Sequence, residues 1–190
     1  MNVFNKLARF RHKEDGNATV EFVFWFPLFM FIFMMGFESG YYMVRTVMLE
    51  RGVDQAARSV RLSNGSVPDL ETLKMNVCQE AAIIPDCMNA LQIELEPVTK
   101  APGGVAAAVG SSVRCIDKAA PPDEDQTGDY TTGVQNQLMI MRVCALSKPF
   151  FATTGIGAGM RVDSRGNYAI VATAAFVNEP GNRTMVASGS

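Results

Sequence analysis

The longest apolar run of the sequence lies near its N-terminus. From Phe22 to Phe37 every side chain is apolar or belongs to Gly or Pro (FVFWFPLFMFIFMMGF). About 20 apolar residues are needed to cross the hydrocarbon of a bilayer, so the stretch from Ala18 to Val44 is long enough to do so. The pattern therefore predicts a transmembrane helix.

The helical pattern continues beyond this run. Asn64-Gly65-Ser66 is a turn sequence, so we predict a single helix over residues 17–62, about 70 Å long, of which roughly half projects from the bilayer. Small residues at Gly52 and Ala56 are expected to let a sheet approach the projecting half closely. Small or apolar residues recur every four positions without an intervening proline, at Val44, Met48, Gly52, Ala56 and Val60.

The rest of the chain predicts a second helix and about four strands. The helix begins near Pro68-Asp69 and is ended by Pro85. Strict alternation from Leu91 to Leu95 predicts a half-buried strand. We predict the other strands at residues 112–116, 137–146 and 167–178, the last of which suits the centre of the sheet.

Strands joined by loops favour an antiparallel sheet, which we expect to pack on the projecting helix in an α+β domain over residues 63–190. The stretch from Lys118 to Gly133 has two prolines and four acids and predicts an exposed loop. Residues 155–160 (GIGAGM) begin like a dinucleotide-binding loop but lack its last glycine and its βαβ setting. We predict a flexible loop there.

The distribution of charge predicts the orientation of the helix. Four basic residues precede the apolar run and only Arg45 and Arg51 follow it closely, so the N-terminus is expected in the cytoplasm and the remainder outside it. A secretory signal would have a small-x-small cleavage site after its apolar core, but Glu38 interrupts this pattern in residues 36–40. The helix is therefore predicted to be a retained anchor.

One acid, Glu21, lies within the predicted transmembrane helix. A carboxylate at mid-membrane costs roughly 2.5–3.5 kcal/mol unless a partner relieves it. Glu21 could lie near the cytoplasmic interface and reach water. Alternatively, cleavage after Gly16 would make it the fifth residue of the mature chain, one helical turn from a new α-amino group. The ammonium and the carboxylate could then neutralise each other between neighbouring subunits.

A basic leader that ends in Gly, an acid at the fifth mature position, a following Phe and an apolar helix with a Pro resemble a type IV prepilin. The segments GNATVEFV, FPLFM and FESG are more specific and resemble the TadE/TadF family of pseudopilins, which serve the tight-adherence (Flp) pilus. This resemblance covers Asp15 to roughly Arg61. Such proteins support assembly of a thin adhesive pilus without being its main subunit.

The resemblance also implies which residues and partners are used. Residues 1–16 would be a cytoplasmic leader that a prepilin peptidase removes between Gly16 and Asn17. Glu21 and Phe22 would act in assembly, with Glu38 as the second acid after the apolar run. The implied partners are the peptidase, other Tad pilins and pseudopilins, an inner-membrane assembly platform and membrane lipid. Many type IV pilins have Phe where this chain has Asn17, so N-methylation does not carry over.

Four cysteines follow the membrane helix, on the side that we expect to be oxidising. Their even number predicts two disulfides. Three pairings are possible, and we favour Cys78 with Cys87, which joins a helix end to a nearby loop, and Cys115 with Cys144, which ties two strands. The domain is thus expected to be periplasmic and cross-linked.

Composition argues against enzymes that use histidine, metal sites and nucleic-acid binding. The only histidine, His12, lies in the leader, and no CxxC motif occurs, so we predict no metal, no cofactor and no enzymatic activity. Loss of the leader leaves 13 basic and 17 acidic residues, a formal net charge of −4, without a basic stripe for nucleic acid.

The sequence thus predicts a bitopic inner-membrane pseudopilin in which α+β structure follows a long anchor helix. The alternative is an uncleaved, signal-anchored periplasmic scaffold or binding protein. A thiol oxidoreductase that uses Cys78 or Cys87 stands third.

Overall fold

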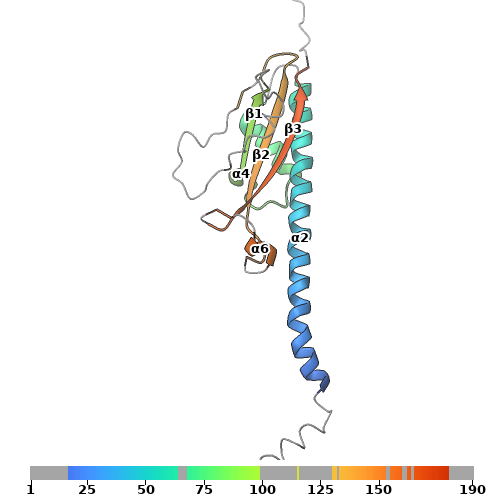
Figure 1. The fold of residues 1–190 in the computed structure, drawn as a ribbon. Helices are drawn as coiled ribbons and strands as arrows, with labels where there is room; N and C mark the ends of the chain where they lie inside the picture. The colour runs from blue at the N-terminus through green and yellow to red at the C-terminus, as the bar shows by residue number, and fades with distance from the viewer. Residues whose placement is uncertain are drawn as a thin grey trace, which may run out of the picture.

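One helix runs along the whole molecule and carries a small α+β domain on one half of its length (Figure 1). The computed structural model describes residues 17–63, 68–98, 115, 130–131, 133–152, 155–159, 162–163 and 165–179. Its helices are α2 (Asn17–Leu62), α3 (Leu70–Glu80), α4 (Cys87–Ala90) and α6 (Gly155–Gly159). Its strands are β1 (Leu91–Pro97), β2 (Leu138–Ser147) and β3 (Tyr168–Val177). The predicted α+β class is confirmed.

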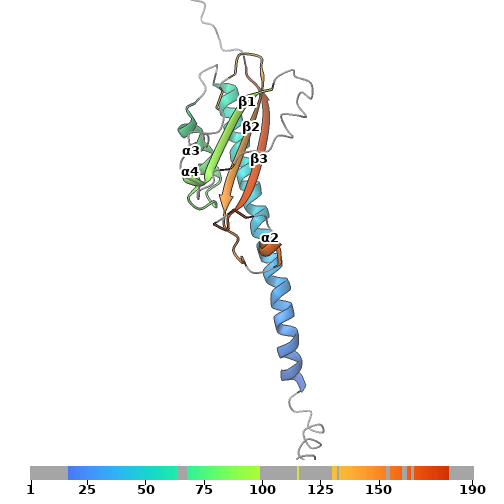
Figure 2. The same ribbon diagram turned by 60° about the vertical axis from the view of Figure 1, so that its left-hand side comes forward.

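Helix α2 has the bounds that the sequence predicted. Its N-terminal half extends away from the domain, while its C-terminal half packs against α3 and β3 (Figures 1 and 2). The helix is long and apolar enough to cross a membrane, and the domain covers none of its most apolar stretch. Large side chains in this stretch, such as Phe24 and Trp25, are exposed. A helix that formed the core of a soluble domain would instead bury such residues.

The buried face of α2 differs from the predicted one. Val44 is 45% exposed, so the predicted repeat of buried residues every four positions is wrong at its first residue. An α-helix has 3.6 residues per turn, so residues spaced strictly four apart move gradually around the helix. Residues that stay on one face are spaced alternately three and four apart. Buried positions on this face are Arg45, Leu49, Gly52, Val53, Ala56, Ala57 and Val60.

Gly52 allows a close approach of α3, where the sequence predicted an approach of the sheet. A Cβ atom built on Gly52 would lie 2.7 Å from the backbone carbonyl oxygen of Val77 in α3. Leu73 and Val77 of α3 are fully buried beside it. The absence of a side chain therefore sets the separation of these two helices.

Helix α3 begins where the sequence predicted and ends earlier. The carboxylate of Asp69 accepts hydrogen bonds from the backbone N–H and the hydroxyl of Thr72, which caps the helix. The helix ends at Glu80, before the predicted stop at Pro85. Proline disfavours the helical conformation in the residue before it, and turns from Ala82 onward lead into α4.

The sheet is antiparallel with the order β1-β2-β3, so β2 is the central strand. The prediction that residues 167–178 form the centre is wrong: β3 is an edge strand of the described sheet and buries alternate residues only. Strands were correctly predicted at residues 91–95 and 137–146. The described sheet has three strands, because residues 112–116 lie outside the described chain except Cys115, which belongs to no strand. The predicted loop at 118–133 also lies largely outside it.

Strand β1 is buried on both faces, whereas the sequence predicted a half-buried strand. Ile93 and Leu95 enter the core between the sheet and the helices, and Glu94 on the opposite face is only 3% exposed. The guanidinium of Arg142 in β2 lies 3.3 Å from the carboxylate of Glu94 and 3.0 Å from that of Glu96. Alternation cannot distinguish a solvated polar face from one whose charges are paired across strands.

The close approach at Gly52 predicts the effect of one added methyl group. Gly52→Ala should lower the free energy of unfolding by about 1–3 kcal/mol, because the new Cβ meets backbone that cannot move aside cheaply. Chemical unfolding of the full chain in detergent micelles measures this. The matched control is Gly40→Ala on the same helix, where no atom lies within 4 Å of the new Cβ. This control should gain about 0.5–1 kcal/mol, and equal effects of the two changes would refute the account.

Candidate functional site

The free N-terminal end of α2 contains the residues that the sequence singled out for processing and assembly. Gly16 lies outside the described residues, and Asn17 is the first residue of α2. Glu21 and Phe22 are both exposed, and the ring of Phe22 stacks on that of Phe26 at a centroid distance of 4.9 Å. The predicted cleavage bond therefore lies at the N-terminal limit of the described part of α2.

Within the described part of the chain, Glu21 has no ion-pair or side-chain hydrogen-bond partner. It lies four residues after the first residue of the helix, about 6 Å along the axis. Both interpretations from the sequence stay open: the side chain could reach water at the interface, or a partner outside this chain could neutralise it.

Glu38, the second predicted assembly acid, is fully buried inside the protein itself. Its carboxylate oxygens accept hydrogen bonds from the backbone N–H groups of Phe150, at 3.0 Å, and Phe151, at 2.8 Å. The structure thus gives Glu38 an intramolecular contact that the sequence did not indicate. Its role in assembly remains a prediction.

Arg45 is a second buried charged residue of α2, and the sequence analysis missed it. Its guanidinium donates hydrogen bonds to the hydroxyl of Ser147, to the backbone carbonyl of Lys148 at 2.9 Å and to the hydroxyl of Tyr168 at 3.0 Å. It also donates to the hydroxyl of Tyr41, and its central carbon lies 4.0 Å from the centroid of that ring. Arg45 therefore joins α2 to the end of β2 and the start of β3.

Glu38 and Arg45 both hold the segment that follows β2. They are seven residues apart, two turns along one face of α2. Apart from Tyr41, their partners lie between residues 147 and 151 or at Tyr168. We call these two side chains and residues 147–151 the polar clamp. The seven-residue spacing, in phase with Leu49, was a signal in the sequence that could have placed both charges on the buried face of α2, although it does not indicate their partners.

An aromatic cluster lies beside the polar clamp. Phe37 and Tyr41 of α2 contact Phe150 edge-on, with centroid distances of 5.5 Å and 5.8 Å. Phe151 lies 6.1 Å from Phe37. These rings extend the apolar surface of α2 onto the domain at the point where the apolar run ends.

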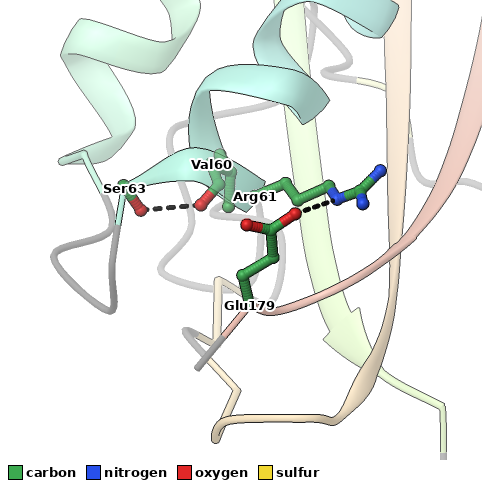
Figure 3. Close-up of polar contacts among 4 residues, drawn as sticks. All are labelled: Val60, Arg61, Ser63 and Glu179. Atoms are coloured by element: carbon green, nitrogen blue, oxygen red, sulfur yellow. Dashed lines mark hydrogen bonds and ion pairs between the residues drawn. The ribbon is translucent and has the colours of Figure 1, made fainter. Parts of the chain in front are cut away.

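At the opposite end of the domain, a surface ion pair joins the last turn of α2 to the chain after β3. The Nε atom of Arg61 lies 2.9 Å from the carboxylate of Glu179, and the hydroxyl of Ser63 donates to the carbonyl of Val60 (Figure 3). Both charged side chains are substantially exposed, so the pair contributes at most about 1 kcal/mol. We assign it no functional role.

Two disulfides cross-link the domain. Cys78 at the end of α3 is bonded to Cys87 in α4, and Cys115 is bonded to Cys144 in the central strand. These are the pairs that the sequence analysis favoured. The first bond fastens the chain between α3 and β1, and the second attaches Cys115 to the sheet face that carries Arg142. Among the described residues, no group of three or more metal-ligating side chains comes together.

The polar clamp leads to a stability prediction. Glu38→Ala should lower the free energy of unfolding by roughly 2–4 kcal/mol, because two backbone N–H groups lose a charged acceptor. Glu38→Gln should lose less, since its amide oxygen can still accept one of the two bonds. Unfolding of the full chain in detergent, with proteolysis near residue 150 as a local readout, measures both.

The control for this experiment is Glu50→Ala. Glu50 is an exposed acid on the same helix, so its removal should change stability by less than about 0.5 kcal/mol. Equal stability of the Glu38 and Glu50 variants would contradict the clamp.

Comparison with known proteins identifies the N-terminal segment. The sequence profile of the family described as TadE-like protein matches residues 16–58, which include Glu21, Glu38 and Arg45. No curated protein and no solved structure gave a significant match. Residues 16–58 are therefore a TadE-like segment, as the motif from Gly16 to Glu38 predicted.

Proposed function

We propose that this protein is a pseudopilin, or minor pilin, that supports assembly of a tight-adherence (Flp) pilus after a prepilin peptidase removes residues 1–16. The TadE-like segment indicates a structural component associated with the Tad pilus. The single observation that carries the finer proposal is the free half of α2, which presents Glu21 on an exposed apolar surface. Such a surface is suited to packing against other helices in a membrane or a fibre.

The proposed mechanism is one of charge neutralisation. Cleavage after Gly16 would create an ammonium group at Asn17, one turn from Glu21. Opposite charges attract more strongly in the low dielectric of a membrane than in water, so a carboxylate of one subunit would favour a position near the N-terminus of a neighbour. This attraction would align neighbouring subunits along the pilus.

The proposal includes a location and a set of partners. Helix α2 would cross the bacterial inner membrane once, with the N-terminus in the cytoplasm and the disulfide-linked domain in the periplasm. The partners would be the prepilin peptidase, other Tad pilins and pseudopilins, the inner-membrane assembly platform and the surrounding lipid. The TadE-like segment and the exposed apolar half of α2 support these contacts.

An uncleaved, signal-anchored scaffold or binding protein is the alternative, since it would use the same helix as its anchor. The mass of the N-terminus of membrane-extracted protein distinguishes the two. A thiol oxidoreductase would need a reactive thiol, whereas Cys78 and Cys87 are bonded to each other here. Labelling of either cysteine by an alkylating agent without reduction would support that activity.

Processing can be tested at the predicted cleavage bond. Gly16→Asp should abolish cleavage, because we expect the peptidase to require a residue without a side chain before the scissile bond. N-terminal sequencing of membrane-extracted protein, with and without the peptidase, provides the measurement. Gly40→Ala, where the added methyl group meets no atom within 4 Å, should be cleaved normally. A chain of the Gly16→Asp variant that still begins at Asn17 would disprove the proposed processing.

Assembly can be tested at Glu21. Glu21→Gln keeps the size of the side chain and removes its charge, so membrane insertion and cleavage should survive or improve slightly. Crosslinking to pilus partners and surface piliation should be lost, because the new N-terminus has no carboxylate to approach. Glu50→Gln, which neutralises an exposed acid beyond the apolar run, should leave both intact. Normal piliation of the Glu21→Gln variant would show that Glu21 is only an interfacial residue.

A further inference from the structure

The segment after β2 contacts α2 at one position along the helix axis. Phe150 and Phe151 contact Phe37, and their backbone N–H groups bind Glu38. The following helix, α6, lies beside α2 below the end of the sheet, on the side of the free N-terminal half (Figure 1). Of the described parts of the domain, the segment after β2 and α6 thus lie nearest to the apolar run.

The hydrocarbon of a bilayer that surrounds the apolar run would end at this position along α2. Residues 20–37 of α2 rise about 27 Å, close to the thickness of a hydrocarbon core. Glu38 and Arg45 are buried in the polar clamp, so α2 exposes no charged side chain between Glu21 and Glu50. A bilayer around the apolar run would therefore reach the clamp without meeting an exposed charge of α2.

The segment itself has the chemistry of a membrane interface. Phe150 is 59% exposed although it contacts three other rings, and Phe37 is 48% exposed beside it. Lys148 is exposed beside these rings, and residues 147–152 contain no acid. Aromatic rings are typical of the boundary between hydrocarbon and lipid headgroups, and a lysine there can reach lipid phosphates with its long side chain.

We propose that the segment from Lys148 to Ala152, with Phe37 and Tyr41, rests in the headgroup layer of the bilayer that α2 spans, with Phe150 inserted among the lipids. The exposed side chain of Lys148 would lie near lipid phosphates. The contact would set the height of the domain above the membrane, and it would keep the carboxylate of Glu38 satisfied where the hydrocarbon begins. This inference rests on the proposed membrane span.

Lipid fits this surface better than a second copy of the chain. The exposed rings continue the apolar surface of α2 at the same height, so one bilayer covers both without a separate interface. The positive charge of the exposed Lys148 complements the phosphates of lipids. The exposed acids Glu50 and Asp54 lie farther along α2, beyond the proposed headgroup layer.

A tryptophan probe can test the contact, because Trp25 is the only tryptophan of the chain. In the Trp25→Phe background, Phe150→Trp places a probe in the proposed interface. Val134→Trp places a matched probe at a 71% exposed residue that lines a surface pocket with Arg61 and Glu179, at the far end of the domain. The proteins are incorporated into phospholipid nanodiscs in which a bromine label on the upper acyl chain quenches fluorescence.

We expect the probe at residue 150 to emit at shorter wavelength than the probe at residue 134 and to be quenched at least twofold more strongly. Ala152→Trp, at another exposed position of the segment, should behave in the same way and replaces the first variant if that variant does not fold. Quenching at residues 150 and 152 no stronger than at residue 134 would overturn the proposal. Short-wavelength emission without quenching would also overturn it, and would indicate that protein covers the segment.

The unmodified protein separates this failure from failure of the proposed function. Trp25 lies on the exposed apolar half of α2 and should be quenched if the helix crosses the bilayer. If Trp25 is quenched and the probes at residues 150 and 152 are not, only the docking proposal fails. If Trp25 is not quenched, the membrane span fails together with the docking that depends on it.

Discussion

The two halves of the single helix α2 lie in different surroundings, and the rest of the structure depends on this constraint. Residues 22–37, in the N-terminal half of α2, are apolar on all sides of the helix and expose rings such as Phe24 and Trp25. The C-terminal half buries one face under α3 and β3 and exposes charged residues from Glu50 onward. Because both halves belong to one continuous helix, the position of the domain along the helix also sets its distance from any membrane that the helix crosses.

The border between the two halves is maintained by polar contacts. Glu38 and Arg45 are charged residues on a buried face. Glu38 accepts hydrogen bonds from the chain after β2. Arg45 donates to Ser147, Lys148, Tyr168 and Tyr41, although its Nε atom has no hydrogen-bond partner among the described residues. Burial of an unpaired charge would cost several kcal/mol, so these contacts favour one position of that segment on the helix. The aromatic rings of Phe37 and Phe150 then extend the apolar surface of α2 onto the domain. The segment that the polar clamp holds against α2 is therefore the same segment that lies at the proposed contact with lipid.

The domain keeps its shape by means that do not involve the free half of α2. Two disulfides fasten α4 and Cys115, and the buried pair of Arg142 with Glu94 joins the central strand to β1. None of these contacts reaches Glu21. The stretch of α2 from Glu21 to Gly36 is therefore available to other subunits without loss of contacts within the domain, as the proposed role in pilus assembly requires.

The sequence by itself determined most of the elements and the TadE-like character of the N-terminal segment. The bounds of α2, the starts of α3 and β1, the approximate extents of β2 and β3, and the TadE-like motif all follow from local patterns along the chain. Only the tertiary structure decided that β2 is central, that Gly52 faces α3, that Glu94 is buried and that residues 155–159 form a short helix where we predicted a flexible loop. Hydrophobic periodicity shows that a residue belongs to a face but not what covers that face. Apart from Tyr41, the partners of Glu38 and Arg45 lie more than 100 residues away in the sequence. The spacing within α2 could place both charges on the buried face, but it could not reveal what they bind.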